Sequence, residues 1–249
     1  MKMLSFASRN TKEIIRDKLT LFFGIGFPLV ILLLLSLINS NIPPEAKMDM
    51  FSIEKLAPGV AVFGLSFISL FSGMIIAKDR SSSFMQRLFT SPMKPSDYIL
   101  GYTLPLIPIA AVQVIVVFAV SIALGLELSV HILSSVAVLM PAAILYIAIG
   151  LLCGSLLSDK QVGSVCGALL ANLSAWLSGT WFDLSLVGGG LEKAAKCLPF
   201  CRAVDAARYA LSGEYGKIMP ELVWVIGYAA VIMVLAVIIF TKKMKSDNN

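Results

Sequence analysis

The sequence predicts an all-α integral membrane protein with six transmembrane helices. Hydrophobic residues make up 58% of its 249 residues and charged residues only 14%. A soluble domain has about 45–50% apolar and about 25% charged residues, so the apolar excess requires lipid rather than one soluble core. Six apolar stretches are each long enough to cross the hydrocarbon core. They are Leu19–Ile38, Ala57–Ala77, Tyr98–Leu124, Ile132–Leu157, Val162–Phe182 and Glu221–Thr241.

Helices are expected in all six stretches, because a helix satisfies its own backbone hydrogen bonds within the bilayer. The alternating apolar and polar segments of a β-barrel are absent from the sequence. The stretch that starts at Leu19 is too long for the apolar region of a signal peptide, and no convincing small-residue cleavage site follows it. We therefore expect it to be retained as the first transmembrane helix.

Charge between the stretches predicts the orientation. Lysine and arginine are more frequent in the segments that would share the side of the N-terminus, which places both termini in the cytoplasm. The long fifth loop is the exception, with five basic residues. The net charge is +5, but the sequence has no basic stripe with interleaved aromatic residues. Anionic lipid headgroups, and not nucleic acid, are therefore the expected partners of the basic residues. We expect a multi-pass protein of a bacterial cell (plasma) membrane.

Residues 1–18 have the pattern of an amphipathic helix. Arg9, Lys12, Glu13 and Arg16 recur at the spacing of one helical face, and apolar residues lie largely on another. Such a helix would lie at the inner headgroup level. A frayed basic tail that only sets topology is the alternative.

The second loop, Lys78–Asp97, is the most polar stretch on the predicted inner side. It contains apolar residues at helical spacing followed by two prolines: Phe84, Met85, Leu88, Phe89, Pro92 and Pro95. A short helix at the cytoplasmic surface could use these apolar residues to dock a soluble partner or simply lie on the membrane, and the spacing favours neither.

The fifth loop, Asp183–Pro220, is long for a connection and contains a predicted helix. Pro199 suits the start of this helix and Gly213 its end. Its charged residues are spaced by three, so that the acid can pair with both bases: Arg202, Asp205 and Arg208. We expect an amphipathic or partly re-entrant helix over the outer end of the bundle; a solvated loop is the alternative.

The fifth transmembrane stretch carries polar residues that should face protein or a wet path, and three of them are candidates for lining a translocation path: Asn172, Trp176 and Ser178. Gly150 with Gly154, and Gly163 with Gly167, form G-x-x-x-G pairs that weakly indicate close helix packing. Kinks are expected at three prolines within the stretches: Pro105, Pro108 and Pro141.

The sequence lacks the motifs of an enzyme. It has no phosphate-binding G-x-x-x-x-G-K-[ST] loop, no H-E-x-x-H and no G-x-S-x-G, so we expect no catalytic, nucleotide or metal site in this chain. His131 is the single histidine, and thiolate metal sites usually need four ligands. A disulfide between Cys197 and Cys201 is disfavoured by their helical spacing. Energy for uphill transport would have to come from another subunit.

Several segments in order resemble the transmembrane permease subunit of type-2 ABC transporters, the mostly exporting class of drug, polysaccharide and peptide efflux systems. The segments are SRNTKEIIRDKLTLFFGIGFPLVILLL (Ser8–Leu34), LAPGVAVFGLSFISLFSGMIIAKDR (Leu56–Arg80), FMQRLFTSPMKPSDYILGYTLP (Phe84–Pro105), LSGTWFDL (Leu177–Leu184) and LPFCRAVDAARYALSGEY (Leu198–Tyr215). The resemblance implies a single transmembrane domain over 1–249, with an interfacial elbow helix at 1–18, a cytoplasmic coupling loop at 78–97 and an extracellular helical hairpin at 183–219.

The resemblance also implies contacts with an ATPase. The residues at the ATPase subunit would be Arg80, Phe84, Met85, Gln86, Arg87, Leu88 and Pro92, with Arg9 and Arg16 of the elbow nearby. After Arg80 the family commonly has an acidic residue and a Gly-Thr pair, where this sequence has Ser81–Ser83, and Gln86 stands where Glu is frequent.

The implied mechanism is that of an ATP-driven exporter. Two permeases, identical or paralogous, would face each other, each bound to a separate ATPase subunit that holds ATP and Mg. The substrate could be a drug, a lipid or a peptide, and multidrug resistance is one such role. A non-transporting membrane protein, such as an immunity or sensory component, is the alternative. An intramembrane enzyme would need paired catalytic groups on facing helices, and the sequence shows none. An ion-coupled carrier would need charge within the membrane or inverted repeats, and neither is evident.

Overall fold

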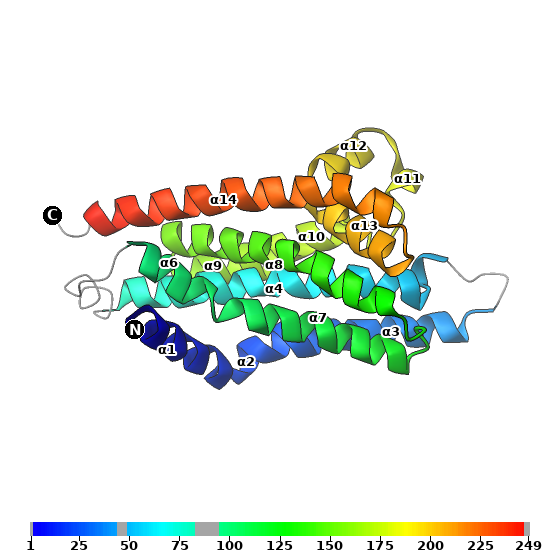
Figure 1. Ribbon diagram of the computed structural model, residues 1–249, viewed down its shortest axis with the longest axis horizontal. Coiled ribbons are helices and arrows are strands. Elements are labelled where there is room, and N and C mark those ends of the chain that lie inside the picture. The colour runs from blue at the N-terminus through cyan, green and yellow to red at the C-terminus, as the bar shows by residue number, and fades with distance from the viewer. Residues whose placement is uncertain (1, 44–48, 83–94, 247–249) are drawn as a thin grey trace.

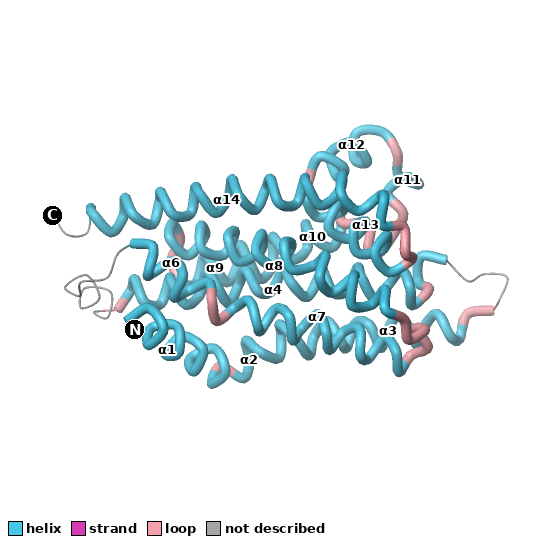
Figure 2. The backbone as a smooth tube through the Cα atoms, in the orientation of Figure 1, coloured by secondary structure: helices cyan, strands magenta, loops and turns pink. Residues whose placement is uncertain are grey.

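The computed structural model describes residues 2–43, 49–82 and 95–246, and every regular element in these ranges is a helix. Figure 2 shows the helices side by side in one bundle, with the described loops gathered mainly at its two ends. The first half contains α1 (Lys2–Arg16), α2 (Lys18–Leu21), the π-helix η1 (Phe22–Gly26), α3 (Phe27–Asn41), the 3₁₀-helix η3 (Asp49–Phe51), α4 (Ile53–Ser81), α6 (Pro95–Thr103) and α7 (Leu106–Ala123).

The second half continues with α8 (Val130–Leu156), α9 (Asp159–Val162), the π-helix η4 (Gly163–Leu170), α10 (Ala171–Leu177), α11 (Leu184–Val187), α12 (Gly189–Cys197), α13 (Pro199–Leu211), the 3₁₀-helix η5 (Tyr215–Lys217) and α14 (Ile218–Ser246). The predicted helix after Pro199 is confirmed as α13, which ends two residues before Gly213. Gly213 adopts a φ of 78°, a conformation that favours glycine and stops the helix.

The all-α membrane fold is confirmed, since helices long and apolar enough to cross a membrane occupy most of the described chain. They are Phe22–Asn41, Ile53–Ser81, Asp97–Ala123, Val130–Leu156 and Tyr215–Lys243. The remaining predicted stretch is not among them, because the helical run of α9, η4 and α10 begins with charged residues and includes Asn172. The prediction of six spans therefore stays a prediction.

The two chain ends lie at one end of the bundle (Figure 1). We call it the termini end; the other end, where α11, α12 and α13 lie, is the α13 end. In Figure 1, α8 runs back to the termini end, and the α9–η4–α10 run then carries the chain to the α13 end. This run packs along α4 over its whole length, as a bundle helix would.

α4 is the central helix. Of its most apolar window 89% is buried, compared with 17% for α14 and for the Phe22–Asn41 helix. It contacts α3, α7, α8, α13 and the α9–η4–α10 run. The apolar faces that remain exposed on α3 and α14 suit lipid, since no soluble protein exposes so much apolar surface without a partner.

Small residues bring α4 and α8 into close contact. A Cβ atom on Gly150 would lie 2.2 Å from the backbone oxygen of Ser69, and one on Gly154 would lie 2.5 Å from that of Gly73. Ser72 also donates across this contact to Ile147 O at 3.0 Å. Close packing of the first glycine pair is thus confirmed, with α4 as its neighbour. The second pair is divided: a Cβ on Gly167 would lie 3.3 Å from Leu70 Cδ2 of α4, but no atom lies within 4 Å of a Cβ on Gly163.

Proline interrupts the helix where predicted at Pro105, which lies in the turn between α6 and α7. Proline cannot donate to the carbonyl four residues earlier, here that of Gly101. Asn10 of α1 donates its side-chain amide to Gly101 O at 2.9 Å, so the released carbonyl is satisfied from a different helix. Pro141 lies inside α8, which continues through it.

Candidate functional site

An open groove of about 590 Å³ runs between α3, α4 and the η4–α10 segment. Aromatic side chains dominate its lining: Phe23, Phe27, Phe63, Phe67, Trp176 and Trp181. A volume of this size suits a drug-sized ligand. Among the residues that line it, polar groups are limited to the amide of Asn172 and the indole N–H groups of Trp176 and Trp181, and no residue is charged.

The sequence creates the groove by setting large residues against small ones. On the η4–α10 side the lining includes Gly163, Gly167, Ala168, Ala171 and Ala175. These residues project little or nothing beyond the backbone, so the helix leaves open space in front of the aromatic side chains of α3 and α4.

The rings of the groove brace one another edge to face. Phe63 and Phe67 have ring centroids 5.3 Å apart at 90°, and Phe63 and Trp181 are 5.6 Å apart at 69°. Phe27 meets Phe67 at 5.8 Å and 85°. These are favourable geometries for ring quadrupoles, so the aromatic wall is held as one unit.

Two of the three candidate path residues line the groove. Asn172 is exposed and donates its amide to Ala168 O of its own helix at 2.8 Å, while 55% of Trp176 is exposed. Ser178 does not line it. Its hydroxyl is buried and bonds to Ala175 O at 3.1 Å and to the Thr180 hydroxyl at 2.6 Å.

Sequence reasoning missed the aromatic residues of η1, α3 and α4 that line the groove. The signal was present, because Phe23 and Phe27, and Phe63 and Phe67, are four residues apart and so lie on one helical face. In an apolar stretch such spacing is indistinguishable from ordinary packing or lipid contact, and only the position of the opposite helix shows that the rings border open space.

A second cluster lies at the termini end, where α1 meets α4 and α6. The Arg9 guanidinium donates to both oxygens of Asp79, at 2.6 and 2.8 Å. The Tyr102 hydroxyl donates to the same carboxylate at 2.9 Å, and Glu13 pairs with Arg9 at 2.7 Å. The Asp79 side chain is only 3% exposed, so its charge depends on these partners.

Aromatic packing extends this cluster to α14. Phe6 of α1 lies edge-on to Tyr102, with ring centroids 4.9 Å apart, and Phe240 of α14 contacts the same tyrosine at 6.2 Å. Polar and aromatic contacts together tie α1, α4, α6 and α14 into one block.

The amphipathic helix predicted at the N-terminus is confirmed as α1, and its three predicted basic residues separate into two groups. Arg9 turns inward to Asp79, whereas Lys12 and Arg16 are exposed. Arg80 also points inward: it donates to Gly154 O at 2.7 Å and to Leu157 O at 3.3 Å at the end of α8. The other predicted coupling residues lie outside the described residues: Phe84, Met85, Gln86, Arg87, Leu88 and Pro92.

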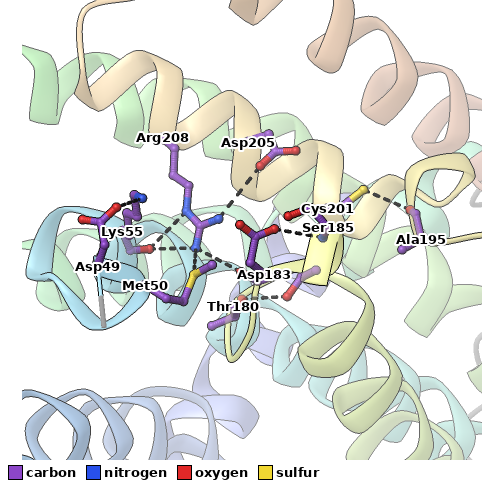
Figure 3. A network of polar contacts seen from close by, with 12 residues as sticks. Asp49, Met50, Lys55, Thr180, Asp183, Ser185, Ala195, Cys201, Asp205 and Arg208 are labelled. Carbon is purple, nitrogen blue, oxygen red and sulfur yellow. Dashed lines mark hydrogen bonds and ion pairs between the residues drawn. The ribbon is translucent and has the colours of Figure 1, made fainter. Parts of the chain in front are cut away.

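A third cluster surrounds Arg208 at the α13 end (Figure 3). Its guanidinium donates to Lys55 O at 3.1 and 3.2 Å and to Gly179 O at 3.1 Å, and it contacts the Met50 sulfur at 3.5 Å. Lys55 lies at the start of α4 and Gly179 follows α10, so one side chain from α13 holds together two elements that border the groove. Burial lowers the pKa of Arg208.

The predicted double pairing of Asp205 is wrong for one of its two partners. Arg208 lies 4.0 Å from Asp205, but Arg202 donates to Glu221 of α14 at 2.8 Å instead. The three residues were one turn apart in sequence, but the start of α14 offers Arg202 a carboxylate at closer range. Burial raises the pKa of Asp205 to about 6, against the opposing effect of Arg208.

We predict that stability depends on Asp205 in the weakly acidic range. Because its carboxyl binds a proton more tightly in the folded state than in the unfolded chain, raising the pH from about 4 to about 6 ionises it and destabilises the fold. The side chain is 41% exposed, so screening limits the effect to about 1 kcal/mol. Melting curves of detergent-purified protein should show the wild type losing stability over this range relative to Asp205→Asn; parallel profiles would contradict the prediction.

Metal ligands are not gathered in the described part of the chain, which contains no group of three or more His, Cys, Asp or Glu side chains placed to hold an ion. His131 bonds through Nδ1 to the Tyr215 hydroxyl at 2.7 Å. All four cysteines, Cys197 and Cys201 among them, are free thiols.

Comparison with known proteins identifies the architecture. A search of curated protein sequences gives no match. The sequence model of the ABC-2 type transporter family matches residues 2–212, which include α1, the groove and α13. This match covers most of the chain and agrees with the multi-pass helical fold. The chain therefore belongs to the ABC-2 type transporter family, as a membrane-spanning permease subunit.

Proposed function

We propose that the chain forms half of the translocation path of an ATP-driven exporter, with the groove as its contribution. The observation that carries this proposal is the groove itself: a lining of aromatic side chains, open along one side, between helices of a membrane bundle. A second permease, identical or paralogous, would close it. The substrate would be an apolar or amphipathic molecule such as a drug, a lipid or a peptide, and efflux of this kind can confer multidrug resistance.

ATP and Mg would be bound by a separate pair of ATPase subunits, since this sequence contains no phosphate-binding loop. We assign their docking site to the loop between α4 and α6. The Arg9–Asp79–Tyr102 cluster joins α4 and α6, the helices on either side of this loop in the sequence, to α1 and α14. A push on the loop would therefore move several helices together, which is how closure of the ATPases would open the path.

The positions of the helix ends and of the basic residues support an orientation with both termini in the cytoplasm. The start of α1, the end of α4, the start of α6 and the end of α14 lie at the same end of the bundle (Figure 1). The termini end also carries many of the basic residues, as the positive-inside rule requires of the cytoplasmic side. The α13 end, with the Arg208 cluster, would then face outward.

Reconstitution tests the proposal. We expect the purified chain alone to hydrolyse no ATP, and to hydrolyse it when co-expressed with an ATPase that carries a Walker loop and co-purifies with it. Proteoliposomes of that complex should accumulate an apolar dye only with ATP. ATP hydrolysis by the chain alone, or failure of any such ATPase to co-purify, would contradict the proposed division of labour.

A further inference from the structure

The groove combines six aromatic side chains with small and aliphatic residues, and no charged residue lines it. The faces of aromatic rings carry negative quadrupole charge and attract cations. Asn172 adds to this character, because its amide nitrogen already donates to Ala168 O and its carbonyl oxygen remains as the acceptor. No lysine or arginine lines the groove.

We infer that the groove binds a monovalent organic cation that carries aromatic rings. The inference rests on the proposed transport function and names its substrate class. An anion would meet ring faces and an amide oxygen with no basic group to balance its charge. A sugar would find one amide and two indole N–H groups for its many hydroxyl groups, and burying the rest unpaired is unfavourable.

The arrangement of the rings suits such a cation better than a plain hydrocarbon chain. Phe63 meets Phe67 and Trp181 edge to face, so the three rings do not share one plane. Differently oriented rings can contact a charged centre and its substituents from several sides, as in aromatic cages for quaternary ammonium ions. A neutral acyl chain would fill the same space but leave the oxygen of Asn172 without a donor or charge.

Two ions of equal shape and opposite charge test the inference. Tetraphenylphosphonium and tetraphenylborate have the same four phenyl groups, so a difference in affinity reports charge. The full chain in nanodiscs of zwitterionic lipid is titrated with each ion, and binding to empty nanodiscs is subtracted. We expect saturable binding of the phosphonium, about tenfold tighter than any saturable binding of the borate.

Variants locate the site. Trp181→Leu should weaken phosphonium binding about tenfold, whereas Trp224→Leu, which removes an aromatic ring from α14 outside the groove, should not change it. Asn172 is exposed and therefore tolerant of substitution. Asn172→Asp should tighten phosphonium binding and Asn172→Lys should abolish it. Equal or tighter binding of the borate, no saturable binding, or phosphonium binding unchanged in Trp181→Leu and Asn172→Lys would each overturn the inference.

Failure of the inference can be told apart from failure of the proposed function. ATP-dependent movement of a neutral or anionic solute through the reconstituted complex, without phosphonium binding, would reject the cation site and keep the transport role. Phosphonium binding that is lost in Asn172→Lys, in a complex that moves no solute, would reject the transport role and keep the cation site.

Discussion

Replacing Arg9 by leucine is expected to destabilise the protein by about 3–5 kcal/mol. The substitution removes the bidentate partner of Asp79, whose side chain is 3% exposed, and leaves that carboxylate with the Tyr102 hydroxyl as its remaining hydrogen-bond donor in the cluster. Breaking one side of a buried ion pair costs more than replacing both sides, because the orphaned charge has lost water as well. Thermal melting in detergent measures the effect.

Two controls belong to this experiment. Lys12→Leu changes an exposed residue of the same helix and should stay within about 0.5 kcal/mol of the wild type. The double variant Arg9→Leu with Asp79→Leu should recover much of the lost stability, since no buried charge remains. If Arg9→Leu melts with the wild type, or if the double variant is the least stable of the three, the ion pair does not hold α1 against α4.

Adding one methyl group between α4 and α8 is the second large expected effect. A Cβ atom on Gly150 would lie 2.2 Å from Ser69 O and 2.6 Å from the Cβ of Ser72, so Gly150→Ala forces two backbones apart. Overpacking of this kind costs about 1–3 kcal/mol, and the upper end is expected because a backbone oxygen cannot rotate away. The central position of α4 means that the shift also reaches the groove.

Gly163→Ala is the matched control for this prediction. It makes the same chemical change in η4, a neighbouring helix of the bundle, where no atom lies within 4 Å of the new Cβ. We expect a melting temperature equal to or slightly above that of the wild type, because alanine favours helix more than glycine does. Equal destabilisation by the two substitutions would show that the α4–α8 contact is not tight.

The sequence was enough to predict features that depend on local pattern. Hydropathy located the apolar stretches, the periodicity of residues 1–18 predicted α1, and Pro199 with Gly213 bounded α13. Gly150 and Gly154 indicated close packing, but not which helix they would contact. The other signals lie within the helices that they predict.

Features that depend on distant residues could not be predicted in this way. Arg9 and Asp79 are 70 residues apart, and nothing in either segment specifies the other. Arg202 was expected to pair within its own helix but pairs with Glu221, because the fold brings the start of α14 closer. Ser178 belongs by spacing to the polar stripe of α10, yet the turn that follows buries its hydroxyl against Thr180.

Accessibility of the groove to water-soluble reagents during turnover tests the central claim most directly. In a chain whose four native cysteines are replaced by serine, Ala168→Cys places a thiol in the groove, and Val234→Cys places one on the exposed apolar face of α14. The complex with its ATPase is treated with a membrane-impermeant thiol reagent. We predict that the thiol of Ala168→Cys is labelled at a rate that changes when ATP is added, and that the thiol of Val234→Cys is not labelled. An unreactive thiol at position 168, with or without nucleotide, would contradict the assignment of the groove as the translocation path.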